Sequence, residues 1–73
     1  MSELYILTEV AGRVCALAKQ AGSRVNAGED VVVVEAMKME IPATSPAAGT
    51  IKSLSVKIDE IVSEGQVVAI LET

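Results

Sequence analysis

Lys38 is the residue whose type and setting best suit covalent chemistry, because its side chain ends in an amine and it lies, between Met37 and Met39, in the segment that separates two copies of an internal repeat. A lysine side chain is mostly protonated at neutral pH and is then a poor nucleophile, so its acylation needs an activated donor. The chain has no histidine and one cysteine, Cys15, so its own residues supply neither a Ser–His or Cys–His pair nor a histidine-containing zinc site. We therefore expect a substrate of enzymes and not an enzyme, with Cys15 as a small apolar strand residue.

Composition narrows the classes of partner. A net charge of −4 and a single aromatic residue, Tyr5, argue against nucleic-acid binding, which needs basic patches and often stacking platforms. The longest apolar run, Val31 to Val34, is far shorter than the ~20 residues of a membrane-spanning helix. The first residues are acidic and lack the apolar region of a secretory signal. We expect a cytoplasmic protein with no nucleic-acid partner and no membrane partner.

The chain contains an internal repeat, because residues 12–36 align without a gap on residues 49–73 after a shift of thirty-seven positions. The aligned pairs of identical residues are Gly12/Gly49, Leu17/Leu54, Val25/Val62, Gly28/Gly65, Val31/Val68 and Glu35/Glu72. Three further pairs exchange one aliphatic residue for another. Matches at glycines and at positions of the buried type predict two halves with the same fold.

The repeat predicts an all-β fold. Valine, isoleucine and threonine dominate short segments that glycine and proline separate. Leu17 breaks the alternation of its strand, and its equivalent does so in the second half, which predicts a bulge or a bend. Gly22 and Asp59 occupy matching turns, where aspartate tolerates a left-handed backbone. We expect one domain over residues 1–73, a flattened β-barrel or sandwich of about eight short strands.

Symmetry also singles out the segment between the two copies, residues 37–46. The equivalent of Lys38 under the repeat is the place where the chain begins and ends, so we expect Lys38 at one end of the domain and the termini at the other. Residues 35–40 contain strong helix formers, which by themselves favour a turn of helix. Six residues between strands are too few for a stable helix. We therefore predict a hairpin with its tip at residues 37–39, built from residues unusual for a turn.

The pentapeptide from Glu35 to Met39, Glu-Ala-Met-Lys-Met, resembles the attachment motif of the biotinyl domains of biotin-dependent carboxylases. The resemblance extends from about Glu9 to Glu72 and includes the glycine-led openings of both halves. It implies covalent biotin on Lys38, with Glu35, Ala36, Met37 and Met39 as the flanking recognition motif. It also implies a carrier of carboxyl groups, whose partners are a biotin protein ligase and the biotin carboxylase and carboxyltransferase components. Free-standing bacterial biotin/lipoyl attachment proteins are similar in size.

Two other functions fit the same fold. A lipoyl carrier domain is modified on a lysine at the same tip, although its tip usually reads Asp-Lys-Ala where this chain has Met37 and Met39. Lipoate, or both groups in turn, is therefore the alternative to biotin. An unmodified interaction module, as in some exporter adaptor proteins, normally lacks the lysine and lies between helical arms.

For several side chains near the tip, both a structural and a functional interpretation are open. Met37 and Met39 either contact a ligase or fill gaps in the core. Four acidic residues either form a docking face for partners or lie on an ordinary solvated surface. These four residues are Glu29, Asp30, Glu35 and Glu40.

Overall fold

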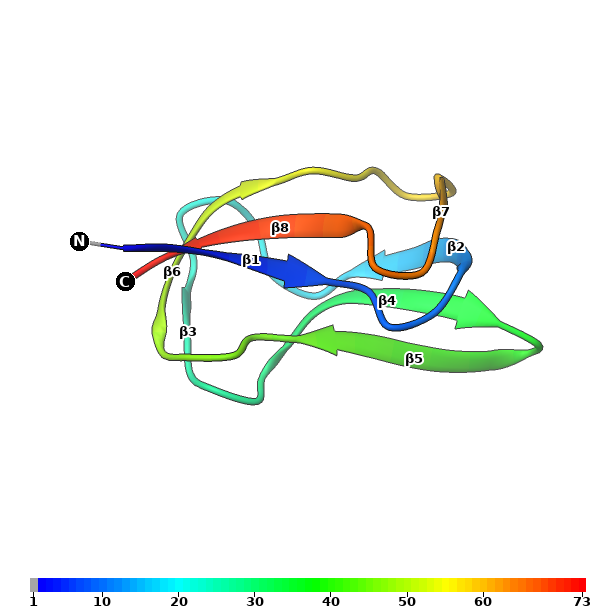
Figure 1. The fold of residues 1–73 in the computed structure, drawn as a ribbon, viewed down its shortest axis with the longest axis horizontal. Coiled ribbons are helices and arrows are strands. Elements are labelled where there is room, and N and C mark those ends of the chain that lie inside the picture. Colours follow the sequence, from blue (N-terminus) through cyan, green and yellow to red (C-terminus); the bar gives the residue numbers. More distant parts are fainter. Residues whose placement is uncertain (1) are drawn as a thin grey trace.

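The computed structural model describes residues 2–73, which form eight short strands joined by tight turns (Figure 1). Over this range there is no helix, and so none able to cross a bilayer. The strands are β1 (Glu3–Leu7), β2 (Gly12–Leu17), β3 (Arg24–Val25), β4 (Asp30–Ala36), β5 (Met39–Thr44), β6 (Gly49–Leu54), β7 (Ile61–Val62) and β8 (Val67–Glu72).

The strands form two antiparallel four-stranded sheets, in the orders β1-β8-β6-β3 and β5-β4-β2-β7. Inward-facing aliphatic side chains from both sheets form the core between them. The core comprises Ile6, Val14, Val25, Val31, Val32, Val34, Ala43, Ile51, Val56, Val62, Val68, Ala69 and Leu71. The all-β prediction is confirmed, and the arrangement is the sandwich form of it, because the two sheets do not close into a barrel.

Each sheet is built from both halves of the sequence, and a shift of thirty-seven residues converts one strand order into the other. The register of β2 against β4 shifts between Val14 and Ala16, so Cys15 is an extra residue that no residue of β4 opposes, although its thiol donates to the carbonyl of Val33. The register of β6 against β8 shifts at the equivalent place. The predicted bulge is therefore present in both halves, and it explains why Leu17 breaks the alternation of its strand.

The termini and the hairpin of β4 and β5 lie at opposite ends of a molecule with a longest dimension of 36 Å (Figure 1). The amide of Thr73 donates to the carbonyl of Ser2 at 2.9 Å, which places the two termini side by side. The turn between β4 and β5 is the most distant point from them in Figure 1. This is the arrangement that the repeat predicts for Lys38.

Gly12 and Gly49 allow neighbouring strands within each half to approach closely. A Cβ atom on Gly12 would lie 2.3 Å from the carbonyl oxygen of Glu35, and one on Gly49 would lie 2.5 Å from that of Glu72. Both distances are far below van der Waals contact, and both obstacles are backbone atoms of the central strands β4 and β8. Glycine is required at these two positions because no side chain fits there.

We expect Gly12→Ala to destabilise the fold by about 3 kcal/mol, because the backbone must move to accept the methyl group. Gly22→Asp is the matched control, since nothing lies within 4 Å of a Cβ at Gly22 and Asp59 already occupies the equivalent turn. This control should cost about 1 kcal/mol. Urea unfolding followed by circular dichroism measures both changes, and equal losses in the two variants would contradict the packing argument.

Candidate functional site

The hairpin of β4 and β5 reverses direction over two residues only. Ala36 pairs with Met39 across the hairpin, which leaves Met37 and Lys38 as the loop. Their φ angles are +52° and +64°, so both residues have left-handed backbones. A two-residue type I′ turn requires this conformation, and Asn-Gly is the sequence that normally adopts it. Methionine and lysine adopt it at a cost of about 1 kcal/mol each.

This turn presents Lys38 at the outermost point of the domain. Met37 is 95% exposed and Met39 is 62% exposed, so neither methionine is a core gap-filler. Lys38 is exposed, and Glu35 and Ala36 are half-buried at the end of β4. The structure thus brings the five predicted site residues together on one hairpin end. Within residues 2–73 there is neither a pocket nor a cluster of side chains suited to hold a metal ion.

A row of charged side chains crosses the outer face of the sheet directly behind the tip. Glu35 on β4 is the cross-strand partner of Glu40 on β5 and, on its other side, of Arg13 on β2. Like charges opposite one another destabilise a strand pair, so Glu35 and Glu40 alone would weaken the base of the hairpin. Arg13 supplies the compensating positive charge within the same row.

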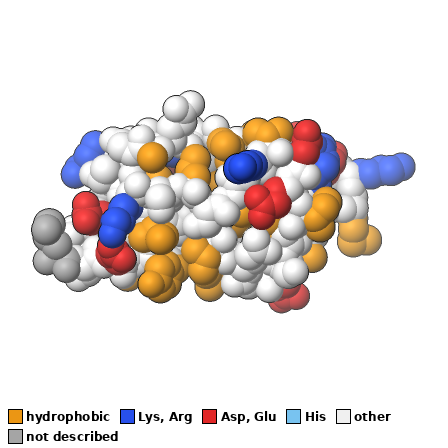
Figure 2. Space-filling view, turned by 90° about the horizontal axis from the view of Figure 1, so that it is seen from above, with side chains coloured by type: hydrophobic (Ala, Val, Ile, Leu, Met, Phe, Trp, Pro, Cys, Tyr) orange, Lys and Arg blue, Asp and Glu red, His pale blue; other side chains and the backbone are white. Residues whose placement is uncertain are grey.

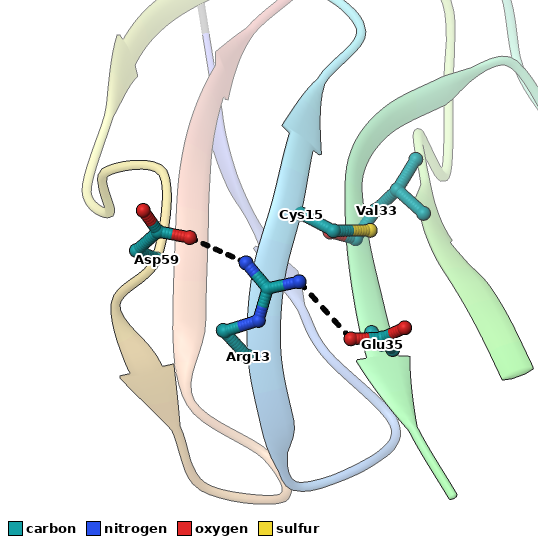
Figure 3. Close-up of polar contacts among 5 residues, drawn as sticks. All are labelled: Arg13, Cys15, Val33, Glu35 and Asp59. Carbon is teal, nitrogen blue, oxygen red and sulfur yellow. Dashed lines mark hydrogen bonds and ion pairs between the residues drawn. The ribbon is translucent and has the colours of Figure 1, made fainter. Parts of the chain in front are cut away.

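Arg13 connects three segments of the chain (Figure 3). Its Nη2 donates to Oε1 of Glu35 at 3.0 Å, and its Nη1 donates to Oδ1 of Asp59 in the turn before β7. These hydrogen bonds, first with Glu35 and then with Asp59, raise the pKa of Arg13. Because Arg13 and Glu35 are about half exposed and Asp59 is mostly exposed, the ion pairs fix geometry more than they add stability.

No local sequence pattern predicts this role of Arg13. The repeat gives one indication of it, because Arg13 aligns with Thr50 in the second half, where no equivalent bridge can form. Asp59 has a φ of +73° at the position equivalent to Gly22, as the matching turns predicted. The left-handed backbone of Asp59 thus carries the carboxylate that Arg13 contacts.

The four acidic residues that sequence grouped together do not lie on one surface. Glu29 and Asp30 lie at the start of β4 and Glu35 lies near its end, next to Glu40. Glu29 accepts a hydrogen bond from the amide of Asn26 at 2.6 Å and pairs with a lysine, contacts that lower its pKa. Glu29 therefore stabilises its own turn, whereas Glu35 and Glu40 belong to the base of the hairpin.

We expect replacement of Met37-Lys38 by Asn-Gly to raise the stability of the domain by about 1–2 kcal/mol, because these residues favour the left-handed turn. The same dipeptide placed at Met39-Glu40, inside β5, is the matched control and should destabilise, since asparagine and glycine are poor strand residues. Thermal unfolding followed by circular dichroism compares the variants. A lower melting temperature for the tip variant would show that the turn is not strained.

Comparison with known proteins agrees with this geometry. The model of the family described as "Biotin-requiring enzyme" matches residues 6–71. The biotin/lipoyl attachment protein of Bacillus subtilis is 33% identical over 64 residues, which cover 88% of each chain. The acetyltransferase component of the pyruvate dehydrogenase complex of Mycoplasma genitalium is 40% identical over 60 residues, which cover 82% of this chain and 16% of that protein.

A solved structure shows the same fold. The urea carboxylase of Kluyveromyces lactis superposes with a TM-score of 0.94 at 26% identity, over 99% of this chain and 6% of that one. The chain thus spans a small part of the length of these two relatives and most of the Bacillus protein. The match over residues 6–71 is consistent with the two sheets and with the exposed lysine hairpin. The chain belongs to the biotin/lipoyl attachment family.

Proposed function

We propose that this chain is a biotin carboxyl carrier, biotinylated on Lys38 by a biotin protein ligase and serving a biotin-dependent carboxylase in the cytoplasm. The observation that carries the proposal is the position of Lys38 in a strained two-residue turn, flanked by exposed methionines, at the end opposite the termini. A turn of this kind holds the lysine outside the body of the domain. The distant termini leave the approach to it clear.

The amine of Lys38 fits covalent attachment of an acyl group. Among the described residues no carboxylate forms an ion pair with Lys38, so no ion pair is broken when its charge is lost. Attachment forms an amide bond between Nζ and the acyl carbon of an activated donor, whose leaving group departs while the ammonium gives up two of its three protons. Bound biotin would supply a ureido nitrogen that takes up a carboxyl group and releases it.

The domain itself contributes position. The pairing of β4 with β5 fixes the direction in which Lys38 leaves the surface, and Arg13 holds the end of β4 through Glu35. A group tethered on a rigid tip is available to each active site at an effective concentration of about mM order, without free diffusion. The partners on this proposal are the ligase, the biotin carboxylase and the carboxyltransferase.

A lipoyl carrier is the second candidate, and one observation favours it. The relative with 40% identity is a component of a pyruvate dehydrogenase complex and not a carboxylase. The two exposed methionines beside Lys38 favour biotin, because ligases that act on the same fold must discriminate through local contacts. Intact mass after incubation with each ligase separates the two candidates.

We expect Lys38→Ala to abolish biotin labelling and to change the melting temperature little, since exposed substitutions typically cost within about 0.5 kcal/mol. Intact mass spectrometry of the purified chain, after incubation with biotin protein ligase, biotin and ATP, measures the label. Circular dichroism reports whether the variant is folded. Label that persists in the variant, or that maps to Lys19, Lys52 or Lys57, would place the attachment site elsewhere.

The tip sequence provides a second test. Met37→Asp combined with Met39→Ala should lower biotinylation and raise lipoylation when both ligases compete for the domain, because the fold is unchanged and only local contacts differ. The ratio of the two products by mass spectrometry is the measurement. A ratio equal to that of the unaltered chain would mean that selection depends on another surface.

A further inference from the structure

The repeat provides an internal control for surface residues, because each position near the tip has an equivalent near the termini. Ile61 on β7 is 73% exposed, and Ile58 in the preceding turn is 47% exposed. Their equivalents in the first half are Arg24 and Ala21. The fold therefore does not need large aliphatic side chains at these positions, and the exposed isoleucines are particular to the tip end.

Ile61 belongs to the row of side chains behind the hairpin. It is the cross-strand partner of Arg13, which is in turn the partner of Glu35. Partners in a sheet project from the same face, so Ile61 lies on the outer face with the charged row. At ~4.8 Å per strand, Ile61 is about 10 Å from β4. Ile58 is next to Asp59, the second carboxylate that Arg13 contacts.

The charges around the two isoleucines are mostly negative. Arg13 is shared between Glu35 and Asp59, which leaves one negative charge in excess, and the exposed Glu40 at the end of the row adds another. We call this set the flank surface; it comprises Arg13, Glu35, Glu40, Ile58, Asp59 and Ile61. Figure 2 shows hydrophobic, acidic and basic side chains intermixed in the half of the molecule from which a basic side chain protrudes.

We propose that the flank surface is the contact area for the biotin protein ligase, an inference that rests on the proposed function. The complementary surface of the ligase is aliphatic where it covers Ile58 and Ile61 and carries lysine or arginine side chains opposite the carboxylates. Unmodified Lys38 has only its own side chain with which to reach an active site. The ligase must therefore approach the tip closely, which brings its surface against the nearest flank of the sheet. Enzymes that act on the longer modified side chain can dock farther away.

The test transfers the residues of the other end to the tip end. The variant Ile58→Ala with Ile61→Arg reproduces Ala21 and Arg24, and it leaves the tip pentapeptide unchanged. Steady-state biotinylation of the full chain by purified ligase, with biotin and ATP, is followed by mass spectrometry. We expect KM for the domain to rise roughly tenfold with kcat unchanged, because contacts that are equal in the ground and transition states affect KM alone. KM should also rise with ionic strength, since charge attraction is screened.

Two further variants keep the result interpretable. Ile61→Ser removes the aliphatic contact without adding charge, and its KM should rise as well. Ala21→Ile with Arg24→Ile creates the same exposed aliphatic residues near the termini, and its KM should equal that of the unaltered chain. Circular dichroism and the melting temperature verify that all variants are folded.

The outcomes separate the two proposals. An unaltered KM in both Ile61 variants, or an equal rise in the control at the other end, overturns the flank surface while biotinylation of Lys38 stands. A KM independent of ionic strength overturns the charge complementarity on which the choice of partner depends. An unaltered chain that gains no biotin overturns the proposed function and this inference together.

Discussion

The left-handed backbone at Met37 and Lys38 persists only because the strands on either side of it are locked in register. A turn built from unfavourable residues relaxes unless its flanks prevent it. Here the cross-strand pairs from Asp30/Thr44 to Ala36/Met39 hold β4 and β5 together, and the buried Val34 anchors β4 in the core. The packing of the sandwich therefore offsets the conformational free energy that the left-handed turn costs. Lys38 owes its position to packing that lies well behind it.

The sandwich that holds the hairpin in register is built from two copies of the same arrangement of strands. β4 and β8 are the equivalent strands, and each is paired on both sides. The carbonyl of Glu35 in β4 lies against Gly12, and that of Glu72 in β8 lies against Gly49. Neither half can bury its apolar face alone, so the halves exchange strands between the sheets. At the place equivalent to the hairpin turn, the second half has the hydrogen bond between Thr73 and Ser2. The symmetric frame thus has one end that closes on the termini and one that is free to carry a protruding turn.

Much of this fold can be predicted from the sequence because the spacing of glycines and the alternation of aliphatic side chains indicate turns and strands. The eight-stranded sandwich, the bulge before Leu17 and the left-handed turn at Asp59 all follow from the repeat. The methionines on either side of Lys38, and its position between the two copies of the repeat, indicate that it is the attachment site. The helix-forming tendency of residues 35–40 predicted the wrong local structure, and tertiary pairing overrides it.

Other features could not be predicted because they depend on which strands become neighbours. Arg13, Glu35 and Asp59 are far apart in the chain, and no local rule brings them together. The buried hydroxyls of Thr8 and Ser45 are a similar case. Each donates to the carbonyl two residues ahead, so burial leaves the hydroxyl satisfied, yet the sequence alone indicates only an ordinary loop.

The placement of Arg13 reconciles two demands on the base of the hairpin. Glu35 and Glu40 oppose each other across the hairpin, and a lysine in place of either would remove their repulsion directly. It would also remove negative charge from the surface next to Lys38. Arginine on the adjacent strand compensates Glu35 from the other side, and Glu40 on the edge strand keeps its charge exposed. Because the compensating cation lies on β2, the row offsets the repulsion between Glu35 and Glu40 and still presents carboxylates beside the tip.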